Sequence, residues 1–281
     1  MRRLDVRARV LVLALLGVGA VCGQPALPPT YGVQTRFNGG QDVVPSFDGW
    51  YRNADGSFTM VFGYLNRNYQ EEPIIAVGPD NKLEPGTADQ QQPTFFLTRR
   101  HAWVYFAKVP ADWGMKELVW SITAHGRTEK AFGSLRMEEE ILPRVVQSRG
   151  NLNPGTENPN RAPAVTIQPV MSATVNTPVQ LGTSVTDDGL PKLRVPKVRS
   201  DTASGTAQTN SATARRLPLH VAWTQYRGPA KVIFDPAAPI IVTDGRAAGT
   251  VRFSEPGTYI LRATANDGEL QTTADISIVV K

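Results

Sequence analysis

The chain has 281 residues, of which 30 are Lys or Arg and 25 are Asp or Glu, so its formal net charge is +5. The first 23 residues contain four arginines and one aspartate, and the +5 less their +3 leaves only +2 for residues 24–281. So small a charge does not indicate a nucleic-acid-binding protein. Because Cys22 is the sole cysteine, the chain beyond it has no thiol nucleophile, disulfide or thiolate zinc site.

The N-terminus has the features of a cleavable signal peptide, residues 1–23. A basic segment precedes an apolar run of 12 residues, Val10–Val21, and small residues follow it. The run is too short to cross a bilayer, so we expect no transmembrane segment. The alternative is a lipoprotein signal, in which Cys22 carries a lipid anchor. Export without disulfides favours a bacterial periplasm, the extracellular space or the cell surface.

Residues 24–148 predict a first β-sandwich domain. Asp-Gly between two alternating runs predicts a hairpin with its turn at Asn53–Gly56. Four side chains of the second run fall on one face, namely Phe58, Met60, Phe62 and Tyr64. Further runs have the composition of strands, and they span residues 73–77, 93–97, 101–109, 116–123 and 127–135.

Aromatic residues are concentrated in this domain, since 14 of the 22 in the chain lie between Phe47 and Trp120. Rings exposed on a sheet suit a glycan-binding surface, whereas rings turned inward form a sandwich core. We expect most of them in the core. Those that break the alternation or lie in polar loops are predicted to be an exposed ligand-binding face: Trp50, Tyr51, Tyr69 and Trp113.

Residues 164–281 predict a second β-sandwich after an Asn-, Pro- and Gly-rich linker at residues 149–163. Trp223 lies mid-strand, where an immunoglobulin-like sandwich has its core tryptophan. Tyr259 follows Pro256-Gly257, at the place of a tyrosine corner. The expected fold class is therefore all-β, with two β-sandwich domains of which the second is Ig-like.

A basic stretch without periodicity, residues 190–216, interrupts the second domain. It has six Lys or Arg against Asp201 and no aromatic residue. We expect a disordered insertion. The alternative is contact with an anionic surface, such as lipid head groups or a cell-wall polymer. Lacking aromatics for stacking, it does not predict nucleic-acid binding.

Residues 166–281 resemble the PKD-like and cadherin-like Ig-fold modules of exported bacterial proteins. The resemblance rests on LGTSVTDDGLP, VAWTQYRGPAKVIFD and FSEPGTYILRATANDGEL. In the first domain, GWYRNADGSFTMVFGYLNRN resembles the N-terminal part of exported bacterial proteins of unknown function. The PKD-like and cadherin-like modules are usually spacers or adhesion and recognition units, so the resemblance implies a non-catalytic role.

Two acidic turns of the second domain are expected at the same end of an Ig-like sandwich. They would bring together oxygen donors of the kind that calcium prefers: Asp187, Asp188, Asn266, Asp267 and Glu269. Cadherin-like modules, which this domain resembles, bind calcium between domains. Asp-Asp-Gly and Asn-Asp-Gly are also ordinary turn sequences, so the alternative is a domain with no metal and no cofactor.

Little in the sequence indicates catalysis. His101, His125 and His220 belong to no metal motif, and no GxSxG elbow occurs. We therefore expect no enzyme. The favoured interpretation is an exported structural or interaction protein of the bacterial periplasm or cell surface with an unknown protein partner. The alternative is a binding module for a glycan or another envelope polysaccharide that uses the aromatic-rich first domain.

Overall fold

The computed structural model describes residues 36–150, 159–192 and 217–281. All the described strands belong to one compact unit, Phe37–Lys281. Some predictions concern residues outside the described part: the signal peptide with Cys22, most of the linker (151–158) and most of the basic insertion (193–216). No helix in the described part is both long and apolar enough to cross a membrane.

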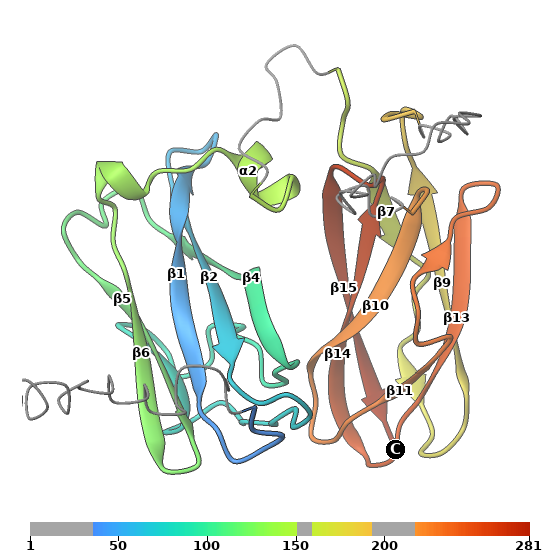
Figure 1. Cartoon of the computed structure of the whole chain (residues 1–281), viewed down its shortest axis with the longest axis horizontal. Helices are drawn as coiled ribbons and strands as arrows, with labels where there is room; N and C mark the ends of the chain where they lie inside the picture. The colour runs from blue at the N-terminus through green and yellow to red at the C-terminus, as the bar shows by residue number, and fades with distance from the viewer. Residues whose placement is uncertain (1–35, 151–158, 193–216) are drawn as a thin grey trace, which may run out of the picture. The chain divides into compact units, whose positions relative to one another are not determined.

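The first sandwich consists of two antiparallel sheets (Figure 1). One has the strand order β1 (Val43–Arg52), β2 (Phe58–Asn66), β4 (Arg99–Val109). The other has the order β3 (Asn81–Glu84), β5 (Leu118–Ala124), β6 (Arg127–Gly133). The predicted hairpin is confirmed, because β1 pairs with β2 and Gly56 N donates to Asn53 O in the turn.

Aromatic rings fill the space between these two sheets. Phe62 of β2 contacts both Tyr105 and Trp120, which come from β4 and β5. The face predicted for β2 is confirmed, because Met60, Phe62 and Tyr64 are buried and Phe58 packs against them. Most of the aromatic residues in this domain therefore stabilise the sandwich by burial rather than line a surface.

Two of the strand predictions are wrong, those for residues 73–77 and 93–97. The two segments meet only at an isolated bridge between Ile74 and Phe95. Ile75 N donates to Thr94 O and Phe96 N to Pro73 O, and a buried side chain satisfies two further carbonyls. Asn81 Nδ2 donates to Ile75 O and Pro93 O, at 3.0 and 2.8 Å. These segments are extended and apolar, which satisfies the sequence pattern of a strand, yet they form no ladder.

A short helical connection leaves the first sandwich. It comprises the 3-10 turn η2 (Met137–Glu139) and the helix α2 (Pro143–Gln147). Arg144 Nη2 of α2 donates to Asn160 O, which follows residues 151–158 in the sequence.

The second sandwich also has two sheets. The first has the order β12 (Ile240–Ile241), β10 (His220–Arg227), β14 (Gly257–Asn266), β15 (Gln271–Val280), β8 (Ser172–Ala173). The second has the order β11 (Ile233–Asp235), β13 (Arg246–Arg252), β9 (Val179–Thr186), β7 (Ala164–Ile167). In chain order these arrangements correspond to the CFG and ABED sheets of an immunoglobulin domain. The Ig-like prediction is confirmed.

Tyr259 forms the predicted tyrosine corner. Its Oη donates to Glu255 O at 2.9 Å, and its ring is buried against Phe253. In an antibody domain the second cysteine of the disulfide lies two residues after this tyrosine. Here Leu261 has that place and lies in one apolar cluster with Leu181 of the opposite sheet. Apolar packing therefore replaces the disulfide, in agreement with the lack of cysteine beyond Cys22.

Candidate functional site

Two of the predicted ligand-binding aromatics are not at the surface. Trp50 is only 1% exposed, and its Nε1 donates to Arg136 O at 2.7 Å. Trp113 is 8% exposed, and its Nε1 donates to Lys116 O at 2.8 Å. The prediction of exposure is wrong for both because a backbone carbonyl in the fold satisfies each indole N–H, which allows the ring to be buried.

The other two predicted residues, Tyr51 and Tyr69, are partly exposed but lie far apart. Tyr51 pairs with Thr59 near the start of β2, whereas Tyr69 follows the end of β2 at Asn66. Seven residues of strand separate these ends by about 23 Å. The Arg99 guanidinium covers the Tyr69 ring at 4.1 Å from its centre. The four aromatics therefore do not form one continuous binding face.

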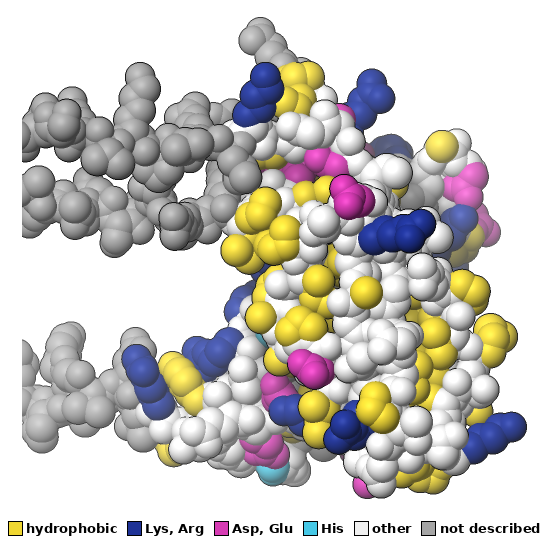
Figure 2. Space-filling model, turned by 90° about the vertical axis from the view of Figure 1, so that its right-hand side faces the viewer, with side chains coloured by type: hydrophobic (Ala, Val, Ile, Leu, Met, Phe, Trp, Pro, Cys, Tyr) yellow, Lys and Arg dark blue, Asp and Glu magenta, His cyan; other side chains and the backbone are white. Residues whose placement is uncertain are grey.

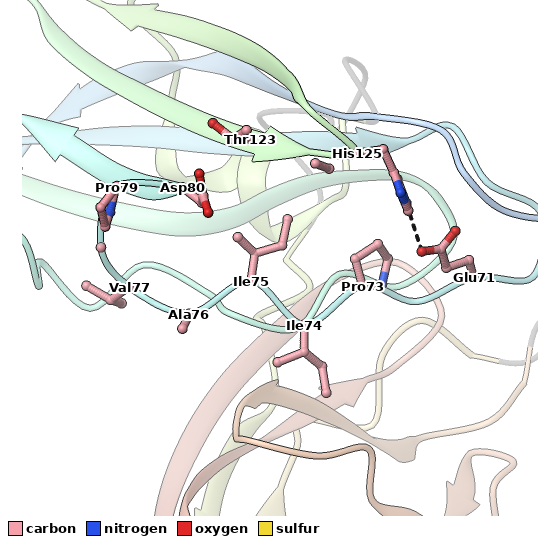
Figure 3. Close-up of a pocket in the computed structure, with 12 residues that line it drawn as sticks. Glu71, Pro73, Ile74, Ile75, Ala76, Val77, Pro79, Asp80, Thr123 and His125 are labelled. Carbon is pink, nitrogen blue, oxygen red and sulfur yellow. Dashed lines mark hydrogen bonds and ion pairs between the residues drawn. The ribbon is translucent and has the colours of Figure 1, made fainter.

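A shallow groove lies beside the turn between β5 and β6. It encloses about 470 Å³, and the extended segment from Pro73 to Asp80 forms one wall (Figure 3). His125 of the turn faces Glu71 across the groove, with Nε2 and Oε1 at 2.9 Å. Glu71 Oε2 also accepts a hydrogen bond from Gly40 N. Since Glu71 thereby holds two separate loops, its carboxylate has a structural role.

The two sandwiches contact each other through a junction that we define as residues 89–95 of the first and 226–228, at the end of β10, of the second. Tyr226 O accepts hydrogen bonds from Thr94 N at 3.1 Å and Phe95 N at 3.3 Å. Gly228 N donates to Thr94 Oγ1 at 3.2 Å. A β-bulge lies between Gln225 and Arg227, and bulges re-aim side chains at the ends of strands.

Arg227 makes the strongest polar contacts of the junction. Its guanidinium donates to both carboxylate oxygens of Asp89, at 2.8 and 3.1 Å, and its Nε donates to Gln92 O at 2.6 Å. This hydrogen-bonded ion pair lowers the pKa of Asp89. The Arg227 side chain is 12% exposed, so solvent screens its contacts less than those of a surface pair.

A second arginine extends the contact. Arg262 of β14 forms a fork with Asp275 of β15, at 2.7 and 2.8 Å, and donates through Nη1 to Val104 O of β4. Its guanidinium lies 4.0 Å from the centre of the Tyr226 ring. These residues were not singled out from the sequence, because Arg227 and Asp89 are 138 residues apart and no local pattern connects them.

The acidic residues predicted as a calcium site lie on two loops that we call the acidic loops, residues 187–189 and 266–270. Asp267 is 4% exposed, and its Oδ1 accepts hydrogen bonds from Glu269 N and Leu270 N. Asp187 Oδ2 accepts from Gly189 N. Burial, followed by the charges of Asp267 and Asp188, raises the pKa of Asp187.

The remaining predicted ligands have positions in the turns of these loops. Asn266 Oδ1 accepts from Gly268 N, and Asp188 accepts through Oδ1 from Leu190 N. Asp188 Oδ2 accepts from Arg161 N at 2.9 Å, which ties the segment before β7 to the first acidic loop. Within the described residues, no group of three or more His, Cys, Asp or Glu side chains has the arrangement of a metal site.

The histidines have structural partners rather than catalytic ones. His101 Nε2 donates to Thr98 O, and burial lowers the pKa of this ring. His220 Nδ1 donates to Pro218 O. With His125 paired to Glu71, each of the three imidazoles is hydrogen-bonded to a backbone carbonyl or a carboxylate.

Charge is not segregated on the face drawn in Figure 2. Basic, acidic and apolar side chains are interspersed there. An extended anionic polymer would be expected to follow a stripe of one charge. The residues predicted to make such a contact are mostly those at 193–216, outside the described part.

Comparison with known proteins gives a resemblance in architecture alone. No family model matches the chain, and no curated protein matches it. Similar solved structures include domains 4 and 5 of the S-layer protein SbsC, at 8% identity over 59% of this chain, with a TM-score of 0.25. The chain spans 65% of that structure's length.

Two other structures are similar over more of the chain. The D00-D0 domain of intimin has 8% identity over 85% of this chain and 100% of its own, with a TM-score of 0.27. A chimeric titin Z1Z2-Z1Z2 tandem has 12% identity over 84% of this chain and 99% of its own, with a TM-score of 0.26. At these values the likeness carries no argument about function or partners.

Proposed function

We propose that the chain is an exported, non-catalytic structural or interaction protein of the bacterial periplasm or cell surface, in which two sandwiches form one rigid spacer that presents a docking face. The observation that carries the proposal is the junction. Sandwiches that only share a tether would be expected to contact each other through few specific hydrogen bonds. Here Tyr226 O accepts two backbone N–H groups, and Arg227 binds both a carboxylate and a carbonyl of the first sandwich.

The junction supports a spacer because its contacts are directional. A guanidinium fork on a carboxylate and backbone hydrogen bonds tolerate little rotation, so together they define one orientation. A protein that transmits position or force between two attachment points benefits from this stiffness. An enzyme would need a site with an activated group, whereas the three histidines contact Thr98 O, Pro218 O and Glu71.

The alternative, a glycan-binding module, has less support. Its binding face was predicted from four aromatics, of which Trp50 and Trp113 are buried. The two that remain lie at opposite ends of β2. A glycan array probed with the full chain and with its Tyr69→Ala variant tests this alternative. A signal that the unmodified chain gives and the variant lacks would favour glycan binding over the spacer.

The junction can be tested with a double-mutant cycle on the full chain. Arg227→Ala, Asp89→Ala and the double variant are compared by urea unfolding. We expect a loss of about 2 kcal/mol for Arg227→Ala and a coupling energy of about 1 kcal/mol for the pair, because a charge-assisted fork and a bond to Gln92 O are removed. A single unfolding transition in the unmodified chain would show that the sandwiches unfold as one unit.

The exposed ion pair between Lys108 and Asp55 provides the control. Both side chains are more than half exposed, so Lys108→Ala should change the free energy of unfolding by less than about 0.5 kcal/mol. Two separate transitions in the unmodified chain, with neither shifted by Arg227→Ala, would contradict a rigid spacer.

Export is tested independently. The full chain, expressed in a bacterium with its own N-terminus, is expected in the periplasmic or surface fraction and shortened by about 23 residues. Two arginines within the run Val10–Val21 should retain it in the cytoplasm. A lipid-modified product that is lost in Cys22→Ser would instead show the anchored form.

A further inference from the structure

We propose that residues 73–77, in the wall of the groove beside the β5–β6 turn, form an open edge to which an extended segment of a partner protein adds as a further strand, with Lys or Arg alternating with apolar residues in that segment. The inference rests on the proposed function, because it assigns the spacer a docking face and a kind of partner. It is carried by backbone groups of the groove that form no hydrogen bond with any described residue.

One side of the open edge is occupied, and the other side is not. Ile75 N donates to Thr94 O, and Ile75 O accepts from Asn81 Nδ2, so both groups of this residue point toward the first sandwich. In an extended chain, successive residues direct their N–H and C=O groups to opposite sides. The groups of Ile74 and Ala76 therefore point the other way, and no described residue binds them. Their spacing of two residues is the one that a neighbouring strand requires.

The open edge is accessible and apolar. Ile74 is 38% exposed, Ala76 is exposed, and both line the groove opposite the turn that holds His125 (Figure 3). An edge with unpaired backbone groups is a template for pairing with another chain. The groove volume of about 470 Å³ lies within the range of about 300–1,000 Å³ that is usual for ligand sites. The groove therefore has room for a short peptide beside the edge.

The charge of the groove favours a basic partner. Glu71 and Asp80 lie at the two ends of the wall, and the described residues that line the groove include no Lys or Arg. Glu71 contacts His125, whereas the exposed Asp80 carboxylate has no hydrogen bond or ion pair with a described residue. A Lys or Arg next to the apolar residues of the partner would complement Asp80 and steer the partner to the groove.

The open edge is continuous with the junction between the sandwiches. Thr94, whose carbonyl accepts from Ile75 N, donates its own N–H to Tyr226 O of the second sandwich. Glu72, just before the edge, forms an ion pair with Lys231 of the second sandwich. The wall of the groove is thus held in place before a partner arrives, which lowers the entropy cost of binding.

The competing explanation is an edge whose backbone groups bind only water. Water satisfies exposed N–H and C=O groups, so such an edge would need no partner. A hydrated edge would not distinguish peptides of opposite charge, and it would not respond to the loss of peptide N–H groups.

The test is the affinity of the full chain for synthetic octapeptides, measured by fluorescence anisotropy at pH 7.5. The lysine peptide alternates Lys with Val, and the glutamate peptide alternates Glu with Val. We expect saturable binding of the lysine peptide and binding of the glutamate peptide that is weaker by about tenfold or more. Two further lysine peptides carry N-methyl groups on every Lys or on every Val nitrogen. One of them should lose binding, since methylation removes the donors along one side of the strand.

Asp80→Lys distinguishes the groove from the rest of the surface. It should weaken binding of the lysine peptide by about tenfold and strengthen binding of the glutamate peptide. Asp112→Lys, the matched control, makes the same charge change before β5, whereas the groove lies at the end of β5. Since the length of the strand exceeds the screening distance, this control should keep the affinity within about threefold. Both aspartates are exposed, so both variants should fold.

The spacer and the docking edge can fail separately. Arg227→Ala, the junction variant, should bind the lysine peptide within about threefold of the unmodified chain, because Asn81 also holds the edge from within the first sandwich. No saturable binding of the lysine peptide, equal binding of the two charge types, full binding of both methylated peptides, or equal effects of Asp80→Lys and Asp112→Lys would overturn the proposal. Self-association of the chain in sedimentation that is lost in Asp80→Lys would make a second copy the occupant and would overturn the assignment of a separate partner.

Discussion

Single residues stabilise the second sandwich, where an antibody domain has a disulfide. Tyr259 links the start of β14 to Glu255 O, and its ring leaves no room for a side chain at position 228. Gly228 has a φ of 156°, and a Cβ placed there would collide with the Tyr259 ring. The corner therefore depends on a tyrosine and a glycine that lie 31 residues apart in the sequence.

The corner predicts a measurable loss in Tyr259→Phe. The ring stays buried, but Glu255 O loses its donor, so we expect the free energy of unfolding to fall by about 1 kcal/mol. Urea denaturation measures the change. Tyr51→Phe, at a partly exposed ring, should lie within about 0.5 kcal/mol of the unmodified chain. Equal effects of the two variants would show that the corner bond contributes nothing.

At the scale of elements, Asn81 explains why two apolar segments are not strands. This residue begins β3 and is fully buried. Its Nδ2 donates two hydrogen bonds, to Ile75 O and Pro93 O. Its Oδ1 accepts a third from Trp120 Nε1 at 3.0 Å. One amide thus positions two connections and a core ring.

Asn81→Ala should be among the most destabilising single changes in the first sandwich. It leaves two carbonyls and an indole N–H buried without partners, which should cost about 3 kcal/mol. The neighbouring Lys82→Ala removes only an exposed pair with Glu84 and should cost less than about 0.5 kcal/mol. Chemical denaturation of both variants would decide, and a similar small loss in each would refute the role of Asn81.

The strands themselves were largely predictable. From Tyr259 onward, buried and partly exposed residues alternate along β14, and alternation with period two is a property of the local chain. The same pattern failed at residues 73–77 and 93–97, because whether an extended segment gains a ladder depends on what lies beside it. The prediction that Trp50 is exposed was wrong for the same reason, because its indole N–H donates to Arg136 O only in the folded chain.

At the scale of the whole molecule, the junction should weaken in acid. Arg227 lowers the pKa of Asp89 in the folded chain below its unfolded value of about 3.9. A carboxyl group with a lowered pKa contributes stability above its unfolded pKa and loses it as the pH falls through the folded value. The coupling energy between Arg227 and Asp89 should therefore be complete at pH 6 and decline below about pH 4.

Double-mutant cycles at pH 6 and pH 3 measure that decline. In Asp89→Asn, the junction's contribution to the free energy of unfolding should be smaller at pH 6 and nearly independent of pH in this range. A coupling energy that stays constant between the two pH values would show that the ion pair does not contribute to the junction, which would then depend on the backbone bonds at Tyr226.

The sequence by itself determined the all-β class, the Ig-like second sandwich, the hairpin at Asn53–Gly56 and the tyrosine corner, because alternation, turn residues and motif spacing act over a few neighbouring positions. Only the tertiary structure decided the junction of Arg227 with Asp89, the burial of Trp50 and Trp113, and the burial of one carboxylate oxygen each of Asp187 and Asp267. Those features depend on which distant segments pack together, and packing sets burial, solvation and the partners of each polar group.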